Sequence, residues 1–229
     1  MWFTVLSDEK RLLPLAIAYA ESEDGLTWNT WKKPKTSGRR WDNYLVLKPG
    51  ENDWNQLGAE TASVVKAPDD RYLMYYTGDL PPEGSHLAAI GLATSLDGVH
   101  WTKCGDGPIF EAENEWEQPV CDKPEDRRTC VGGVTEPSVI YDAKENRFKM
   151  WYAGIGKKDG VISFRIGYAT SPDGVNWTRQ KEPVLDKGGA GSWDELWVSH
   201  TNVVPDPVKG YHLFYFGTAA ADYHEGYDL

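Results

Sequence analysis

The feature that most constrains the fold is a pattern that occurs three times along the chain. The copies begin at Ile17, Ile90 and Ile166, at intervals of 73 and 76 residues. The second and third copies open with Ile-Gly-x-Ala-Thr-Ser, and all three end with Asp-Gly-x-x-Trp. A fixed period of this kind is typical of repeat architectures, so equivalent positions of successive units are expected to lie next to one another.

Each copy predicts β-structure. The Ile-Gly-x-Ala run alternates small and large residues, Asp-Gly favours a tight hairpin turn, and the Trp begins the returning strand. Two further apolar runs joined by a polar loop precede each of the later copies, as in residues 138–140 and 147–154. One unit is therefore four antiparallel strands, and the predicted fold is an all-β propeller built of four-stranded blades.

Residues 1–229 are expected to form a single domain, which the repeat divides into two blades with a partial blade at each end. The expected boundaries are a partial blade at 1–50, blades at 51–112 and 113–186, and a partial blade at 187–229. About three blades' worth of chain does not close a ring, because propellers have about four or more. Either the chain is a fragment, or its open blade edges pair with another copy, and a homo-oligomer is expected.

Composition narrows the range of partners. A net charge of −11 and a pI of about 4.9 argue against nucleic acid and anionic membranes. No apolar run reaches the length of a membrane span, and no signal peptide is visible at the N-terminus. The 11 Trp and 12 Tyr residues fit blade cores, and they fit carbohydrate-binding clefts equally well.

The three cysteines are compatible with either an oxidising or a reducing cellular compartment. Cys121 and Cys130 flank an insertion between two blades, and a disulfide there would indicate an extracellular or periplasmic protein. Free thiols in a cytosolic protein are an equal alternative. The spacing of the two with Cys104 matches no zinc pattern.

Candidate catalytic groups lie just before each innermost strand, at the mouth of the expected channel. These positions hold Glu60-Thr61, Glu136 and His200. Glycosidic cleavage requires one protonated carboxyl and one ionised carboxylate, and mutual repulsion and burial separate their pKa values. The alternative is that Glu136 caps a loop or pairs with an arginine such as Arg165.

The segment 135–177 resembles the five-bladed propeller glycosidases, the superfamily of arabinanases, β-xylosidases, invertases and levansucrases. The resemblance extends over nearly the whole chain. It implies a glycoside hydrolase acting on arabinan-, xylan- or fructan-like substrates, with no required cofactor. It further implies Glu136 as general acid, Glu60 or its neighbour Thr61 as pKa modulator, and His200 near the axis, where a calcium ion is expected.

The family's general base has no counterpart, because the leading blade lacks its innermost strand. Asp53, Asp194 and Glu195 could substitute, although all three fit ordinary inter-blade loops. The residues expected to bind substrate are Thr61, Trp54, Asp194 and Trp197.

Two other functions remain open from the sequence. A non-catalytic carbohydrate-binding propeller fits the missing base, and a scaffold for protein binding fits the repeats alone. The Asp-Gly turns are similar to the Asp-box of sialidases, although one residue short. Asp24, Asp97 and Asp173 are assigned to turn formation and not to catalysis.

Overall fold

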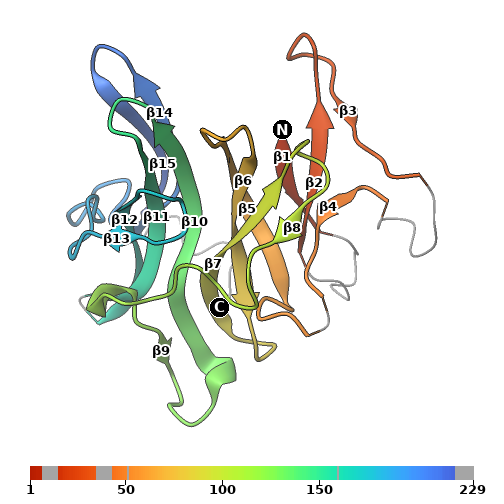
Figure 1. The fold of residues 1–229 in the computed structure, drawn as a ribbon. Coiled ribbons are helices and arrows are strands. Elements are labelled where there is room, and N and C mark those ends of the chain that lie inside the picture. Colours follow the sequence, from red (N-terminus) through yellow and green to blue (C-terminus); the bar gives the residue numbers. More distant parts are fainter. Residues whose placement is uncertain (7–14, 35–42, 51, 159, 220–229) are drawn as a thin grey trace.

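The structure is a computed structural model that describes residues 1–6, 15–34, 43–50, 52–158 and 160–219. Within these ranges the chain is all-β, as predicted, and holds no α-helix (Figure 1). Short 3-10 turns occur only at Glu115–Glu117 and Arg127–Thr129 in this part of the chain. Parts of the leading segment 1–50 lie outside the described residues.

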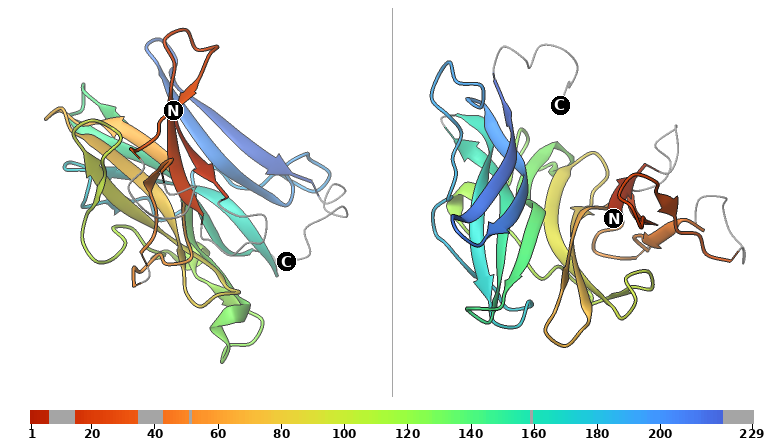
Figure 2. Two further views of the ribbon diagram at one scale, coloured as in Figure 1. Left: turned by 90° about the vertical axis from the view of Figure 1, so that its right-hand side faces the viewer. Right: turned by 90° about the horizontal axis from the view of Figure 1, so that it is seen from above.

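The strands group into four units that follow one another in chain order, from red to blue (Figure 2). The first unit contains β1 (Trp2–Val5), β2 (Ala16–Glu21), β3 (Asn29–Thr30) and β4 (Leu45–Leu47). The second contains β5 (Gly58–Lys66), β6 (Tyr72–Leu80), β7 (His86–Ser95) and β8 (Thr102–Lys103). The third contains β10 (Cys130–Asp142), β11 (Arg147–Lys158), β12 (Val161–Ser171) and β13 (Thr178–Arg179), and the fourth contains β14 (Trp197–Asp206) and β15 (Gly210–Thr218).

The second and third units have the predicted four-stranded antiparallel order, but they are also joined to each other. The start of β10, at Val131–Gly133, pairs in parallel with the start of β7, at His86–Ala88. A Cβ added at Gly133 would lie 2.1 Å from the carbonyl oxygen of Ala88, so only glycine permits this approach. The repeat alone did not predict this continuous sheet, because Gly132-Gly133 has the composition of a loop.

The hydrophobic core lies between neighbouring units. One buried cluster joins Leu73, Tyr75 and Ile90 of the second unit to Phe148 and Met150 of the third. Similar clusters lie between the first and second units and between the third and fourth. Each inner unit therefore buries one face against the unit before it and the other against the unit after it, as stacked repeats do.

The Asp-Gly turns have the structural role expected of them. The Asp97 carboxylate accepts hydrogen bonds from the backbone N–H groups of Val99 (3.0 Å) and His100 (2.8 Å). Asp24 and Asp173 accept the equivalent bonds in their own turns. These carboxylates replace backbone partners that the turn leaves unsatisfied.

Two of these turns also connect neighbouring units. The indole N–H of Trp2, in the first unit, donates to the carbonyl of Gly98 in the second (2.8 Å). The hydroxyl of Tyr75, in the second unit, donates to the carbonyl of Gly174 in the third (2.8 Å). An aromatic side chain of the earlier unit thus holds the turn of the following unit.

A disulfide joins Cys121 and Cys130, where β9 (Val120–Cys121) pairs with the start of β10. The structure therefore contains the first of the two thiol arrangements that the sequence left open, while Cys104 is free. No helix in the described part of the chain is long and apolar enough to cross a membrane.

Candidate axial site

The innermost strands β5, β10 and β14 lie beside one another, and each bulges at the same point. The bulged residues Thr61, Glu136 and His200 have φ values of 48°, 54° and 49°. A left-handed backbone at three non-glycine residues is costly and persists only where the surroundings hold it. The three positions together line an open hollow of about 480 Å³ between the strands, which we call the axial hollow.

Hydrogen bonds from one unit to the next fix these bulges. The backbone N–H of Thr61 donates to the hydroxyl of Thr4 (2.9 Å), and that of Glu136 donates to the hydroxyl of Thr77 (2.9 Å). Thr4 and Thr77 occupy equivalent places in the second strands of their units. At the third junction the N–H of His200 donates instead to the carboxylate of Glu136, at 2.5 Å.

The exception at the third junction has a simple cause. The residue of the third unit that corresponds to Thr77 is Ala153, which has no hydroxyl to accept a bond. Ala153 is fully buried, and its small side chain leaves the acceptor role to Glu136. Glu136 is therefore both a residue of the hollow and the link that holds the bulge of the fourth unit.

Glu136 and His200 are neighbours, as the repeat geometry predicted. One carboxylate oxygen of Glu136 lies 3.2 Å from His200 Nδ1, which is also 2.8 Å from the hydroxyl of Ser199. Glu136 is only 9% exposed, and burial raises its pKa, while His200 acts to lower it. The His200 side chain is 64% exposed and has Phe216 edge-on at 5.8 Å.

Glu60 is the second candidate carboxyl, but it is not the counterpart of Glu136. The bulge aligns Thr61 with Glu136 and His200, and it aligns Glu60 with Thr135 and Ser199. Burial, and then the charges of Asp79 and Glu136, raise the pKa of Glu60 to about 7.

Asp79 is a carboxyl that the sequence analysis missed. It lies on β6, with its carboxylate over Gly58, where an added Cβ would clash with it. Burial raises its pKa to about 6. The equivalent residues of the later units are Ile155 and Thr218, so an acidic residue that breaks the repeat was the signal available.

Thr61, the first of the predicted substrate-binding residues, lines the hollow with its hydroxyl 2.5 Å from that of Thr77. Trp54 stacks on Tyr76, with ring centroids 6.1 Å apart. Asp194 accepts hydrogen bonds from Ser192 (2.8 Å) and Tyr215 (3.2 Å).

Trp197 lies at the start of β14 and packs on Phe164. Of the four residues expected to bind substrate, only Thr61 thus lies at the hollow. Trp54 and Trp197 pack against other rings, and Asp194 is hydrogen-bonded within its own unit.

The proposed substitutes for the missing base have partners of their own. Asp53 forms an ion pair with Lys103 and accepts a bond from the N–H of Gly50 (2.8 Å). Glu195 accepts a bond from the N–H of Gly191 (2.5 Å). Across the described ranges no three His, Cys, Asp or Glu side chains are grouped to hold a metal ion, so calcium near His200 stays a prediction.

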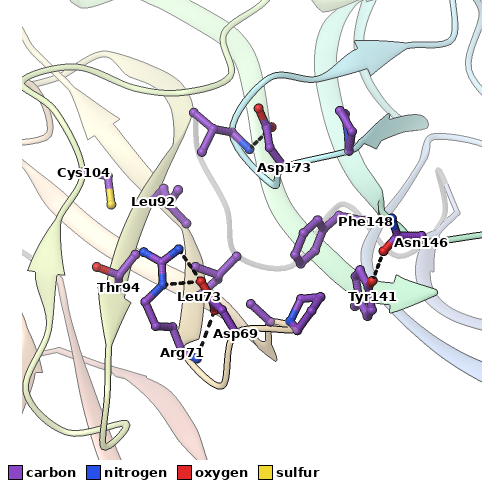
Figure 3. A pocket seen from close by; sticks show the side chains of 14 residues that line it. Asp69, Arg71, Leu73, Leu92, Thr94, Cys104, Tyr141, Asn146, Phe148 and Asp173 are labelled. Atoms are coloured by element: carbon purple, nitrogen blue, oxygen red, sulfur yellow. Dashed lines mark hydrogen bonds and ion pairs between the residues drawn. The ribbon is translucent and has the colours of Figure 1, made fainter. Parts of the chain in front are cut away.

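A second hollow, of about 300 Å³, lies between the second and third units (Figure 3). Leu73, Leu92 and Phe148 line it with apolar atoms, and an Asp69–Arg71 ion pair lies at one side. Its two carboxyls are engaged in local structure, Asp69 with Arg71 and Asp173 in its own turn. The axial hollow holds the buried Glu136 beside His200 and is the better candidate for chemistry.

Comparison with known proteins supports the fold. No family model matches the chain. An uncharacterised protein of Mycobacterium tuberculosis is 29% identical over 150 residues, and the match covers 63% of this chain but only 44% of that protein. The match thus spans less than half the length of this curated relative.

Solved structures give the same picture. The β-1,2-mannobiose phosphorylase of Listeria innocua has a TM-score of 0.59 at 19% identity, covering 90% of this chain and 46% of its own. Fructan 1-exohydrolase IIa of Cichorium intybus has a TM-score of 0.59 at 16% identity, covering 91% and 33%. A glycosyl hydrolase of Bacteroides ovatus has a TM-score of 0.55 at 18% identity, and the match covers 88% of this chain and 59% of that protein.

The chain therefore has the fold of part of a five-bladed propeller glycosidase, as the resemblance predicted. Closure of the ring is not seen in the described residues, since the fourth unit consists of a single pair of strands. Pairing with a second copy stays a prediction.

Proposed function

We propose that the chain holds the sugar-cleaving site of a glycoside hydrolase acting on oligosaccharides or polysaccharides of the arabinan, xylan or fructan type. The observation that supports this most is the position of Glu136 at the axial hollow, where its charge also acts on the carboxyl of Glu60. Burial and the neighbouring charges of Asp79 and Glu136 raise the pKa of Glu60 to about 7, so Glu60 can hold a proton near neutral pH. Glycosidic cleavage requires one protonated carboxyl beside an ionised one.

The surroundings of each carboxyl suggest its role. Burial and two neighbouring carboxylates raise the pKa of Glu60 to about 7, whereas burial raises the pKa of Glu136 and the charge of His200 lowers it. Glu136 lines the hollow beside His200, where a carboxylate can act on the sugar or on a water molecule. These surroundings favour Glu60 as proton donor, the reverse of the roles that the family resemblance implied.

The test is a panel of aryl glycosides and of arabinan, xylan and fructan oligosaccharides. Each is assayed with and without inorganic phosphate, because one structural neighbour is a phosphorylase. We expect Glu60→Gln and Glu136→Gln each to lower kcat/KM by roughly 100-fold or more. The matched control is Glu125→Gln in an exposed loop, which is expected to leave kcat/KM unchanged.

The result also separates the two roles. A substrate with an activated leaving group needs little proton donation, so it is expected to restore turnover to the variant that lacks the acid. Restoration in Glu60→Gln supports Glu60 as the proton donor, and restoration in Glu136→Gln supports the family order. Full activity in both variants would refute the proposed site.

A non-catalytic sugar-binding site is the second candidate, and one observation favours it. Of the three equivalent bulge positions only one holds a carboxylate, and that carboxylate is occupied by the backbone N–H of His200. Saturable sugar binding by calorimetry without any turnover would establish this function. Absence of both would leave the protein-binding scaffold.

A further inference from the structure

A buried threonine, Thr77, lies between the two carboxyls that we assign to the reaction. It is 1% exposed and lies on β6, directly opposite Glu60 on β5. Facing residues of an antiparallel pair project to the same side of the sheet, so the side chains of Glu60 and Thr77 are neighbours. The Thr77 hydroxyl also accepts the backbone N–H of Glu136 at 2.9 Å. One side chain thus neighbours Glu60 in its own unit and holds Glu136 in the next.

The Thr77 hydroxyl has all of its hydrogen-bonding capacity in use. Besides the N–H of Glu136, it has the hydroxyl of Thr61 at 2.5 Å and that of Thr135 at 3.1 Å. A hydroxyl has one hydrogen and two acceptor lone pairs. One lone pair takes the N–H, so Thr77 donates to one of these threonines and accepts from the other. Together the three bonds fix the orientation of its side chain.

This group of hydroxyls extends to the axial hollow, which Thr61 and Glu136 both line. The two residues have left-handed backbones, with φ values of 48° and 54°. Such a conformation persists only where the surroundings hold it. Thr77 contacts the side chain of Thr61 and the backbone of Glu136, so it ties together a hydroxyl and a carboxylate of the hollow.

The neighbouring units offer a comparison for this role. Thr4, the equivalent residue of the first unit, accepts the N–H of Thr61 at 2.9 Å, but the bulge that it holds carries no carboxyl. Ala153, the equivalent residue of the third unit, has no hydroxyl. The hydroxyl at this place in the second unit is thus the one that holds a carboxylate-bearing bulge.

We propose that Thr77 is a positioning residue of the axial site, which sets the placement of Glu136 relative to Glu60 and to the hydroxyl of Thr61. The inference rests on the proposed function, in which the two carboxyls carry the reaction. Glycosidic cleavage depends on the separation of its two carboxyls. A shift of about 1 Å in a reacting group can cost on the order of 100-fold in rate, so a buried residue away from the substrate can control turnover.

The test compares Thr77→Val, which keeps the shape of threonine without its hydroxyl, with Thr77→Ser, which keeps the hydroxyl. On the aryl glycoside that the parent protein cleaves, we expect Thr77→Val to lower kcat by roughly tenfold or more and to change KM by less than about threefold. Thr77→Ser is expected to recover most of kcat. Amide hydrogen exchange at Glu136 is expected to be faster in Thr77→Val, because its N–H loses its acceptor. If Thr77→Val does not fold, Thr77→Ala takes its place, since the third unit has alanine here.

Thr4→Val is the matched variant, because it removes an equivalent hydroxyl bond at the preceding junction. It is expected to speed exchange at Thr61 and to raise KM more than it lowers kcat, since Thr61 lines the hollow without being one of the two carboxyls. Equal losses of kcat in Thr4→Val and Thr77→Val would refute the proposal, because they would reflect a general loss of stability.

Unchanged exchange at Glu136 in Thr77→Val would also refute the proposal, as would a Thr77→Ser variant no more active than Thr77→Val. A parent protein without turnover would instead refute the proposed function. Exchange at Glu136 would then still decide whether Thr77 holds this residue in place.

Discussion

At the residue scale, Glu136 has two roles: it accepts the hydrogen bond that holds the last bulge, and it lines the axial hollow. The hydroxyls of Thr4 and Thr77 hold the preceding bulges, but Ala153 cannot hold the last one. Glu136 accepts that bond while it faces the hollow next to His200. Its loss would therefore disturb the structure and the proposed chemistry together, and the two effects need separate variants.

Glu136→Ala and Glu136→Gln make this separation. The glutamine keeps an oxygen that can accept the N–H of His200, whereas the alanine leaves this N–H without its partner, at a cost of about 1–3 kcal/mol. We expect faster amide exchange at His200 in Glu136→Ala than in Glu136→Gln, measured by hydrogen exchange. Equal exchange in the two variants would contradict the link.

The raised pKa of Glu60 predicts how the free energy of unfolding depends on pH. Its folded pKa of about 7 lies above the ordinary value of 4.5, so the folded state binds the proton more tightly than the unfolded state. This contribution is fully present below about pH 4.5 and is lost as the pH rises through 7. We expect Glu60→Gln to be more stable than the parent at pH 8, by on the order of 2 kcal/mol, and similar to it at about pH 4.

The measurement is chemical denaturation at both pH values. Asp79 titrates in the same range, with a pKa of about 6, so part of the pH dependence persists in the variant. A parent protein whose stability rises between about pH 5 and pH 8 would contradict the assignment.

At the element scale, much of the fold followed from local sequence. Alternating residues and Asp-Gly turns predicted the strands and hairpins, because these depend on neighbours in the chain. The bulges at Thr61, Glu136 and His200 were not predicted, since their left-handed backbone is fixed by hydrogen bonds from the preceding unit. The contact between Glu136 and His200 was predicted from the repeat, but Asp79 was missed because it departs from the repeat.

The Asp-Gly turns offer a comparison within one chain. Asp97→Ala removes two bonds to backbone N–H groups and loosens the turn that the first unit holds through Trp2. We expect a loss of about 1 kcal/mol, seen as a lower Tm, without a change in turnover or sugar binding. Asp24→Ala is the control: Gly25 and Gly98 each accept a bond from the tryptophan of their own turn, but Gly98 also accepts one from Trp2 of the first unit, so a smaller shift is expected for Asp24→Ala. The reverse order would contradict the role of the Asp97 turn in joining the units.

At the scale of the whole molecule, stability depends on contacts between successive units. The buried clusters lie at the junctions, and the parallel pairing of β7 with β10 makes one sheet of two units. The disulfide closes the insertion at this junction. Ring closure could not be predicted or seen, because it depends on strands beyond the repeats that the described residues contain.

The double variant Cys121→Ser and Cys130→Ser tests how much the disulfide contributes to the free energy of unfolding. The bridge spans a sequence separation of 9 residues. A closed loop of this size restricts the unfolded chain by about 2–3 kcal/mol. We expect a lower Tm, equal to that of the parent protein in reductant, with Cys104→Ser as the control that leaves Tm unchanged. Identical Tm values for the double variant and the oxidised parent would contradict the expectation.

The hydrogen bonds that fix the bulges all run in one direction. Each acceptor belongs to the earlier unit and each N–H to the later one. During synthesis the ribosome releases the N-terminal part of a chain first, and folding can begin there. We therefore expect each newly emerging unit to find the acceptor for its bulge in the unit that precedes it.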